Sequence, residues 1–458
     1  MKLKLPDSYI IIFYIIVICG VASYIIPSGI FDRQLDAITG ITYVVPNSYH
    51  LIKQTPVTVI EIFKAIPLGM LAAEDIIIFV LIAGGSFGII EATGVVNGLI
   101  GSITKKINRK EKIIIPVVMI VFSLGGAILG TAEEILPLIP IFITLAIGLG
   151  YDAITGTAMV FLGTLSGFIA GFLNPFSTGT AQRIAQLPLF SGFTYRIVCY
   201  IVILTASIIF VMHKANIAKK KTGKNDKENN LYQEFGINEF PELTRKHIYI
   251  TITLICGFIF LIHGSIKNKF NIMDVATLFL MMGIFSGVIG RFKPNRIVSE
   301  FINGASNILY GTLIIGLARG ILVIMSTGNI QDTIIVYLSH IVSIFSPVLC
   351  GISMFIVHML ISLFIPSATG EASVTMPLMI ALADLSKVTR QTAVLAYQFG
   401  EGITYLLNPT SGYLMAILAI SGISWTKWVK WVWPLFAIWF ILGCVLITIS
   451  VMNGYGPF

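Results

Sequence analysis

Long apolar stretches alternate with short polar segments along the whole chain. Nine of these stretches approach the roughly 20 residues with which a helix crosses a bilayer. They lie near 8–28, 75–92, 155–173, 194–212, 247–264, 271–290, 308–326, 389–407 and 431–452. Two more, at about 113–150 and 345–385, have polar centres and are expected to enter the membrane and turn back. The pattern predicts an all-α polytopic membrane protein with about nine transmembrane helices and two re-entrant hairpins.

Helix-breaking motifs recur at one spacing in the two halves of the chain. Asn174-Pro175 and Asn408-Pro409 interrupt apolar stretches and are 408 − 174 = 234 residues apart. The pairs that begin at Thr93 and Thr327, each followed by glycine, repeat this interval, since 327 − 93 = 234. The stretch at 247–264 has no counterpart, as expected for a linker that inverts the second half. The sequence therefore predicts two inverted-topology repeats, each with one hairpin and one broken helix.

These motifs divide the chain into four predicted parts. They are a first inverted repeat at 1–212 (hairpin about 113–150, broken helix about 155–190), a cytoplasmic loop at 213–246, a linker transmembrane helix at 247–265, and a second inverted repeat at 266–458 (hairpin about 345–385, broken helix about 389–424). Residues 56–74 and 294–312 follow the first span of each repeat and are amphipathic. Such a pattern predicts helices that lie along the membrane interface.

Composition supports a membrane protein. Of the 458 residues, 56% are hydrophobic and only 11% are charged, whereas soluble domains carry about 25% charged residues. A net charge of +8 in a soluble chain would suggest nucleic-acid binding, but here lysine and arginine cluster at the edges of the predicted spans. This placement predicts a lipid bilayer as the partner and no nucleic acid. By the positive-inside rule, it also predicts a cytoplasmic N-terminus.

Several function classes are disfavoured by missing motifs. The five cysteines all lie in apolar stretches without a CxxC spacing, so no disulfide or metal role is expected. The sequence contains no Walker motif and no recognisable pair of nucleophile and base, so we expect neither an ATP-driven pump nor an enzyme, and no cofactor.

Acidic residues inside apolar stretches are the clearest candidates for chemistry. Glu133 and Glu134 lie at the turn of the first hairpin, and Glu371 lies at the turn of the second. Glu401 precedes the second Asn-Pro break. An ionisable group at mid-bilayer costs about 2.5–3.5 kcal/mol on insertion scales. Three roles fit such residues: pairing with a cationic substrate, carrying a coupling proton, or binding Na⁺.

Hydroxyl and amide side chains at the turns and breaks complete a candidate site. The predicted substrate-binding residues are Thr131, Glu133, Glu134, Asn174, Ser177, Thr178, Ser367, Thr369, Glu371, Glu401, Asn408, Thr410 and Ser411. The first break is richer in hydroxyls, so an ion, if one binds, is expected at Asn174, Ser177, Thr178 and Thr180. Arg183 and Arg319 are candidates for binding a carboxylate, and Arg319 is favoured as a partner that neutralises a glutamate. His358 is interpreted as a packed core residue.

The N-terminal segment carries a family resemblance. Leu5 to Tyr9, followed by Tyr24 to Asp32, resembles the start of YfcC-type carriers in the anaerobic four-carbon dicarboxylate carrier (DcuC) family of the ion transporter superfamily. The resemblance covers nearly the whole chain. It implies a homodimer in the bacterial cytoplasmic membrane, with a scaffold domain and a transport domain that moves like an elevator. The hairpin tips lack the Ser-Asn-Thr motif of Na⁺-binding members, which leaves an equivalent Na⁺ site in question.

The leading hypothesis is a secondary active transporter of amino acids that works by exchange or by coupling to H⁺ or Na⁺. Cationic substrates such as arginine or ornithine are favoured, because carboxylates outnumber basic residues in the candidate site. A four-carbon dicarboxylate carrier is the alternative, with the hairpin N-termini and Arg183 receiving the carboxylates. An ion channel is a third hypothesis, which the gated inverted-repeat plan disfavours.

Overall fold

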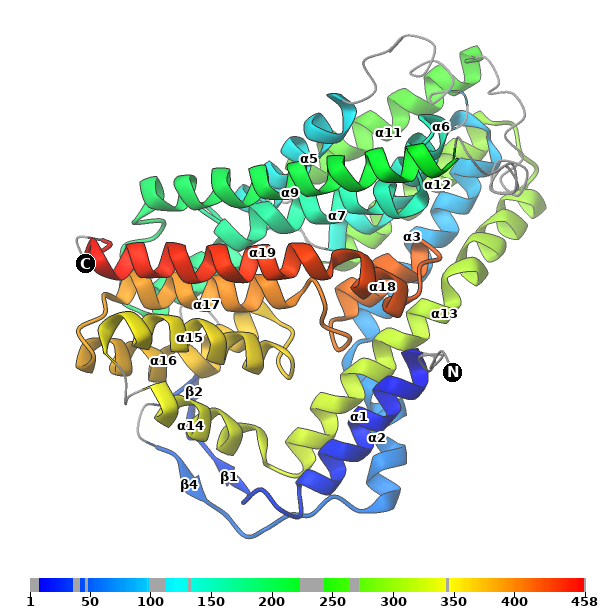
Figure 1. The fold of residues 1–458 in the computed structure, drawn as a ribbon. Helices are drawn as coiled ribbons and strands as arrows, with labels where there is room; N and C mark the ends of the chain where they lie inside the picture. The colour runs from blue at the N-terminus through cyan, green and yellow to red at the C-terminus, as the bar shows by residue number, and fades with distance from the viewer. Residues whose placement is uncertain are drawn as a thin grey trace.

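The computed structural model describes residues 8–35, 42–45, 48–96, 98, 113–130, 133–222, 243–263, 272–342 and 346–456. Helices dominate, and two small antiparallel sheets pair β1 with β4 and β2 with β3 (Figure 1). The elements before the linker are α1 (Ser8–Ala22), β1 (Gly29–Ile30), β2 (Arg33–Leu35), β3 (Thr42–Val44), β4 (His50–Leu51), α2 (Val59–Ala72), α3 (Glu74–Ala92), α5 (Ile114–Leu124), the π-helical η2 (Gly125–Leu129), the 3-10 helix η3 (Glu133–Leu138), α6 (Ile139–Gly148), α7 (Ala153–Ala170), the π-helical η4 (Pro175–Gly179), α8 (Thr180–Ile184) and α9 (Phe193–Thr222).

The remaining elements are helices. They are α11 (Arg245–His263), α12 (Ile272–Ile289), α13 (Pro294–Thr327), α14 (Gln331–Val342), α15 (Pro347–Ser362), α16 (Ala368–Leu385), α17 (Arg390–Thr404), α18 (Gly412–Ile420) and α19 (Trp425–Met452). The predicted stretch at 345–385 contains α15 and α16 joined by a turn, whereas the stretch at 113–150 contains α5 and η2 before residues 131–132, which lie outside the described residues, and η3 and α6 after them. Their re-entrant path and the inverted relation of the halves stay predictions.

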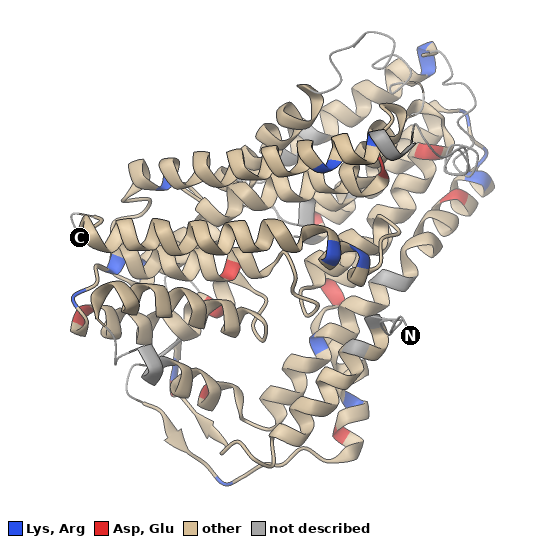
Figure 2. Cartoon of the chain, viewed as in Figure 1, with Lys and Arg blue, Asp and Glu red and all other residues tan. Residues whose placement is uncertain are grey.

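Long apolar helices make this a mostly helical, multi-span membrane protein. Among the described residues, four helices are long and apolar enough to cross a membrane, or up to five if the two parts of α13 form one bent span. The four are Glu74–Ala92, Ala153–Ile184, Phe193–Lys219 and Trp425–Met452. Charged residues are sparse on the central helices (Figure 2).

The two broken helices lie at the centre of the protein. Every residue from Ile154 to Ala170 in α7 is buried, and so is every residue from Gln391 to Thr404 in α17. A helix that is covered on all sides belongs to the interior of a bundle. The polar groups of these two helices are therefore shielded from lipid and water by the surrounding helices.

The apolar core falls into two clusters. The larger cluster includes α7, α15, α17 and α19, whereas the smaller one joins α1, α2 and α13. Glycines let α13 approach α2 and α3 closely: a Cβ on Gly69 would lie 2.4 Å from the carbonyl oxygen of Gly316, and a Cβ on Gly88 would lie 2.8 Å from Gly304 Cα. Small residues commonly permit such backbone contact between membrane helices.

The sequence missed the strands between α1 and α2. Arg33 in β2 donates to both carboxylate oxygens of Asp332 at 2.8 Å, and the backbone N–H of Phe31 donates to the same carboxylate at 3.0 Å. Tyr49 and Thr333 share a 2.9 Å hydrogen bond. These contacts fasten the strand segment to the start of α14 (Figure 1).

Two helices extend across predicted boundaries. The interface helix expected at 294–312 and the span expected at 308–326 form the single helix α13, bent by 44°. No proline interrupts its hydrogen-bond ladder after Pro294, so the helix continues. The loop expected from residue 213 also begins later, because α9 continues through a lysine-rich, helix-favouring segment to Thr222. The rest of that predicted loop, at 223–242, lies outside the described residues.

Candidate functional site

The first break is a turn closed by Asn174 and Thr178. α7 ends at Gly171, which adopts a left-handed backbone with φ 35°. Asn174 Oδ1 accepts hydrogen bonds from the N–H groups of Phe176 (2.9 Å) and Ser177 (3.1 Å), while Pro175 begins the next helical turn. An N-cap asparagine followed by proline is a favoured helix start. The hydroxyl of Thr178 donates to the carbonyl of Gly171 at 2.6 Å.

The second break is fastened to the hairpin of its own half. Asn408 Nδ2 donates to the carbonyl of Ser362 at 2.9 Å, and Thr410 Oγ1 donates to the carbonyl of Leu363 at 2.7 Å. Both carbonyls lie at the C-terminal end of α15. Ser411 caps α18 by accepting from the N–H of Leu414 at 3.3 Å. The three predicted binding residues therefore hold backbone together in this structure.

A glutamine connects α17 to the first break. Gln398 Oε1 accepts from Thr178 Oγ1 at 2.7 Å and also from Arg196 Nη1. Its Nε2 donates to the carbonyl of Phe168 at 3.0 Å and reaches Ser177 Oγ at 3.4 Å. These contacts bring residues more than 200 positions apart into one buried polar group. The side chain of Gln398, from the second half of the chain, lies at the break of the first half.

Both hairpin turns reach the first break. Gly130, with φ +67°, ends the first arm of the first hairpin, and a Cβ there would lie 2.6 Å from Asn174 Oδ1. Thr369 Oγ1, at the turn of the second hairpin, donates to the carbonyl of Phe176 at 3.4 Å. Ser367 caps α16 through the N–H of Gly370 at 3.3 Å. The first break is therefore the meeting point of the two hairpins.

Three predicted residues of the first hairpin cannot be placed by side chain. Thr131 lies outside the described residues, and only the backbone of Glu133 and Glu134, in η3, is described. The helix η3 contacts α18, which follows the second break. Their proposed role in binding stays a prediction.

Two acidic side chains form a buried cluster with His358. Glu371 Oε1 lies 2.8 Å from His358 Nδ1, and both side chains are fully buried. Glu401 is also fully buried and interacts electrostatically with Glu371. Neither Glu401 oxygen has a hydrogen bond of standard geometry, although the hydroxyl of Tyr405 lies nearby. Two carboxylates this deep cannot both stay ionised without a compensating positive charge.

A buried arginine lies near this cluster along α17. Arg196 in α9 is fully buried, and its Nε and Nη2 have no hydrogen-bond partner among the described residues. Its Nη1 contacts Gln398, which precedes Glu401 by three positions on α17. Side chains at that spacing have Cβ atoms about 5–6 Å apart on one helix face. Gln398 therefore links the buried guanidinium of Arg196 to the face of α17 that carries Glu401.

The arginines named from the sequence lie elsewhere. Arg183 is exposed on α8, and Arg319 is half-buried on α13. Neither forms an ion pair with a glutamate among the described residues, which do not include the side chains of Glu133 and Glu134, so the pairing of Arg319 with a glutamate stays a prediction. His358 has a specific partner rather than only packing contacts. The missed residues Arg196 and Gln398 interrupt apolar helices, and that signal was present in the sequence.

The ion site expected beside the first break has few free oxygens. The hydroxyl of Thr178 is engaged with Gly171 and Gln398, and Thr180 Oγ1 lies 3.5 Å from the carbonyl of Pro175. Asn174 leaves only its Nδ2 unpaired, which is a donor and not a cation ligand. Ion binding at these residues stays a prediction.

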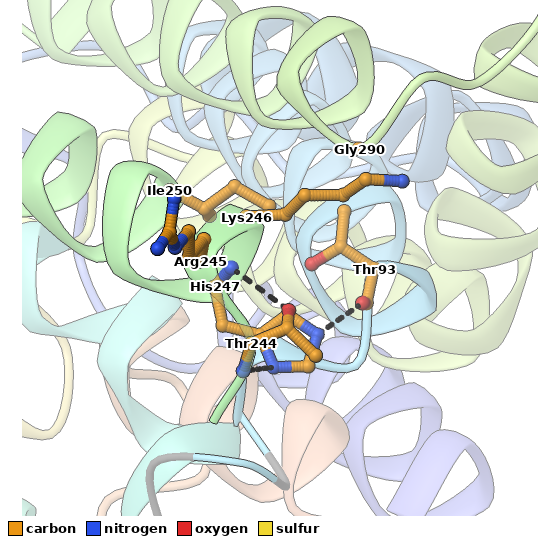
Figure 3. Close-up of a pocket in the computed structure, with 7 residues that line it drawn as sticks. All are labelled: Thr93, Thr244, Arg245, Lys246, His247, Ile250 and Gly290. Carbon is orange, nitrogen blue, oxygen red and sulfur yellow. Dashed lines mark hydrogen bonds between the residues drawn. The ribbon is translucent and has the colours of Figure 1, made fainter. Parts of the chain in front are cut away.

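Two cavities lie away from the buried cluster. One of about 450 Å³ is lined by Thr93, Thr244, Arg245, Lys246, His247, Ile250 and Gly290 (Figure 3). His247 Nε2 lies 3.2 Å from the carbonyl of Thr93, which docks the linker helix α11 on the end of α3. The other, of about 360 Å³, is lined by residues at the end of α13, by Gln331 and by Ile365. It therefore adjoins the turn of the second hairpin.

Broken helices that surround fully buried, unpaired charged groups define the class of this protein. Such groups inside a membrane bundle mark substrate or ion pathways, and discontinuous helices are typical of secondary transporters. The protein is thus a membrane transporter rather than an enzyme. A family model described as the C4-dicarboxylate anaerobic carrier, DcuC, matches residues 5–452, and the chain belongs to this family.

Individual relatives were found among curated proteins and solved structures. The chain is 30% identical to "Putative basic amino acid antiporter YfcC" of Escherichia coli K12, over 98% of this chain and 97% of that protein. It is 27% identical to an uncharacterized Haemophilus influenzae protein, over 89% and 81% of the two chains. Solved structures of the YdaH transporter of Alcanivorax borkumensis (15% identity, 99% and 100% coverage) and of MtrF of Neisseria gonorrhoeae (18%, 100% and 98%) each align with a TM-score of 0.44. Similarity at that level assigns neither topology nor substrate.

Proposed function

We propose that this protein is a secondary transporter of amino acids, with cationic ones such as arginine or ornithine favoured. One observation carries the proposal: on α17, Gln398 contacts the buried guanidinium of Arg196, and the buried carboxyl group of Glu401 follows three positions later. A substrate with a carboxylate at one end and an amine or guanidinium at the other matches both charges. A dicarboxylate matches only the first.

The assignment of groups follows from their charges. Arg196 receives the α-carboxylate, since a guanidinium presents its donors in a fork that fits a carboxylate. Glu401 receives the cationic end of the substrate, with Glu371 beside it. Two carboxyl groups against one guanidinium favour a substrate with net positive charge. The name of the YfcC relative, which describes a basic amino acid antiporter, also favours a cationic substrate.

Counterflow in proteoliposomes tests this function. Vesicles loaded with unlabelled arginine should take up labelled arginine, and lysine and ornithine should compete, whereas succinate and fumarate should not. Na⁺ and proton gradients are varied separately. Labelled succinate counterflow without arginine counterflow would reverse the assignment.

Two observations support the alternative function, a four-carbon dicarboxylate carrier. The family description names such substrates, and Arg196 is a buried group suited to a carboxylate. In that case a second basic group would have to hold the far carboxylate, and the exposed Arg183 would be the residue to test. Conductance without counterflow would instead indicate a channel.

The transport cycle proposed here is an elevator-like alternating access in a homodimer. The two apolar clusters support a division between a scaffold with α1, α2 and α13 and a transport unit with the hairpins and broken helices. The inverted repeats and re-entrant hairpins belong to the same proposal, as does a cytoplasmic N-terminus in the bacterial inner membrane. Cross-linking of single cysteines between the two units, in inward- and outward-facing conditions, tests the motion. The mass of the purified protein tests the dimer.

A further inference from the structure

The cluster around Glu371 contains more polar atoms than its hydrogen bonds satisfy. Five atoms have no hydrogen bond of standard geometry among the described residues, although the hydroxyl of Tyr405 lies near Glu401: Glu371 Oε2, both carboxylate oxygens of Glu401, Ser362 Oγ and His358 Nε2. All four side chains are fully buried. The hydroxyl of Ser362 lies beside Glu371 without a hydrogen bond of standard geometry. An unpaired buried polar group is expensive, so this arrangement points to a ligand that binds and leaves.

The buried arginine that contacts α17, Arg196, bonds Gln398 rather than either glutamate. The titratable groups facing Glu371 come from two helices: His358 on α15, and Tyr397 and Glu401 on α17, with Tyr405 at the end of α17. The hydroxyl of Tyr397 donates to the carbonyl of Ala368 at 2.6 Å. Among the described residues, no lysine or arginine forms an ion pair with either glutamate.

The neighbouring helices add no further charge to the cluster. α19 packs on α15 through apolar contacts such as Phe355 with Phe440. On α14, Asp332 is paired with Arg33 and so is engaged elsewhere. The part of α7 that crosses α17 carries no titratable residue between Ala153 and Ala170. The two carboxyl groups therefore depend on an exchangeable cation.

The geometry favours a proton as that cation. His358 Nδ1 and Glu371 Oε1, 2.8 Å apart, form a hydrogen bond through which a proton can be shared. A bound proton compensates one carboxylate without requiring a coordination shell.

We propose that the His358–Glu371–Glu401 cluster holds an exchangeable proton that a cationic substrate displaces. The inference rests on the proposed function for the identity of the displacing cation. When the substrate cation binds Glu401, the charge it brings replaces that of the proton, which leaves for the compartment that the site faces. The net charge of the cluster is the same before and after. The transporter is then a proton–cation exchanger.

Infrared difference spectroscopy on the purified protein tests the proton site without any substrate. Between low and high pH, the wild type should show loss of a protonated carboxylic-acid band. Glu371→Gln and Glu401→Gln should each remove or shift that band. Glu300→Gln is the matched control, because Glu300 pairs with Arg296 near the surface and should leave the band unchanged. A band that persists unchanged in both cluster variants overturns the proposal.

Proton release on substrate binding tests the exchange in the wild type, so it does not depend on a variant that folds. Adding arginine to weakly buffered protein with an indicator dye should release on the order of one proton per bound substrate. Arginine counterflow without any proton release overturns the inference and leaves the proposed function standing. Absence of arginine counterflow, together with a Glu371-dependent acid band, overturns the substrate assignment and retains the proton site.

Discussion

The two Asn-Pro breaks share a motif but differ in how their polar atoms are satisfied. At the second break, Asn408 and Thr410 bind carbonyl groups at the end of α15, so the motif fastens a hairpin. At the first break, Asn174 Nδ2 has no partner, and Thr178 bonds Gln398 from the other half. The motif thus closes backbone at both breaks, but only at the first does it also bind a polar side chain from the other half of the chain. The comparison teaches that a repeated motif need not repeat its role.

The largest effect is expected from the acidic side of the site near the first break. Glu401→Gln should lower arginine counterflow on the order of a hundredfold or more. It removes the buried carboxylate that pairs with the cationic end of the substrate, and breaking a buried ion pair costs roughly 3–5 kcal/mol. Initial rates in proteoliposomes measure this, with Glu300→Gln as the matched control. Retained arginine counterflow in Glu401→Gln would remove the acidic cluster from substrate binding.

Arg196, the basic residue of the proposed site, is expected to bind only the carboxylate end of the substrate. Arg196→Gln should raise KM for arginine about tenfold to a hundredfold, since it removes charge-assisted hydrogen bonds to a carboxylate worth about 1.5–3 kcal/mol. Competition by agmatine, the analogue without a carboxylate, should change far less. Equal losses for both compounds would mean that Arg196 acts through the fold and not through the carboxylate.

A matched pair of hydroxyl deletions tests the comparison directly. Thr178→Val should chiefly raise KM, by several-fold, because it releases Gln398 and with it the position of Arg196. Thr410→Val should chiefly lower the free energy of unfolding, by about 1–3 kcal/mol, because the carbonyl of Leu363 loses its donor. Thermal unfolding in detergent and KM are measured for both variants. If the two variants lost stability and affinity in the same proportion, the breaks would have equivalent roles.

The smallest effect is expected at Arg183. This residue is exposed on α8, and surface substitutions usually change free energies by about 0.5 kcal/mol or less, so Arg183→Ala should alter arginine KM by only about twofold. The same variant provides the test of the dicarboxylate alternative. A large loss of succinate counterflow in Arg183→Ala would shift the substrate site toward α8.

Local signals explain what could be predicted about the site. Asn174 and Asn408 were recognised because an Asn-Pro pair breaks an apolar helix wherever it occurs. Glu371 and Glu401 were recognised because a carboxyl group inside an apolar stretch is costly on its own. His358 was expected to be a packed core residue and is fully buried, but its hydrogen-bond partner was not predicted, because a histidine in an apolar helix has no local sign of its partner. The pairing with Glu371 depends on how α15 and α16 lie against each other.

The sequence by itself determined the membrane class, the approximate positions of four long apolar helices, the places where α7 and α17 end at an Asn-Pro pair, and the apolar surroundings of Glu371 and Glu401. These properties follow from apolar length and from the backbone chemistry of proline and asparagine, which act within a few residues. Only the tertiary structure decided which polar groups meet. Thr178 and Gln398 are 220 positions apart, and Arg196 and Gln398 are 202 apart. Contacts at such separations depend on the packing of α7, α9 and α17, which no local pattern specifies.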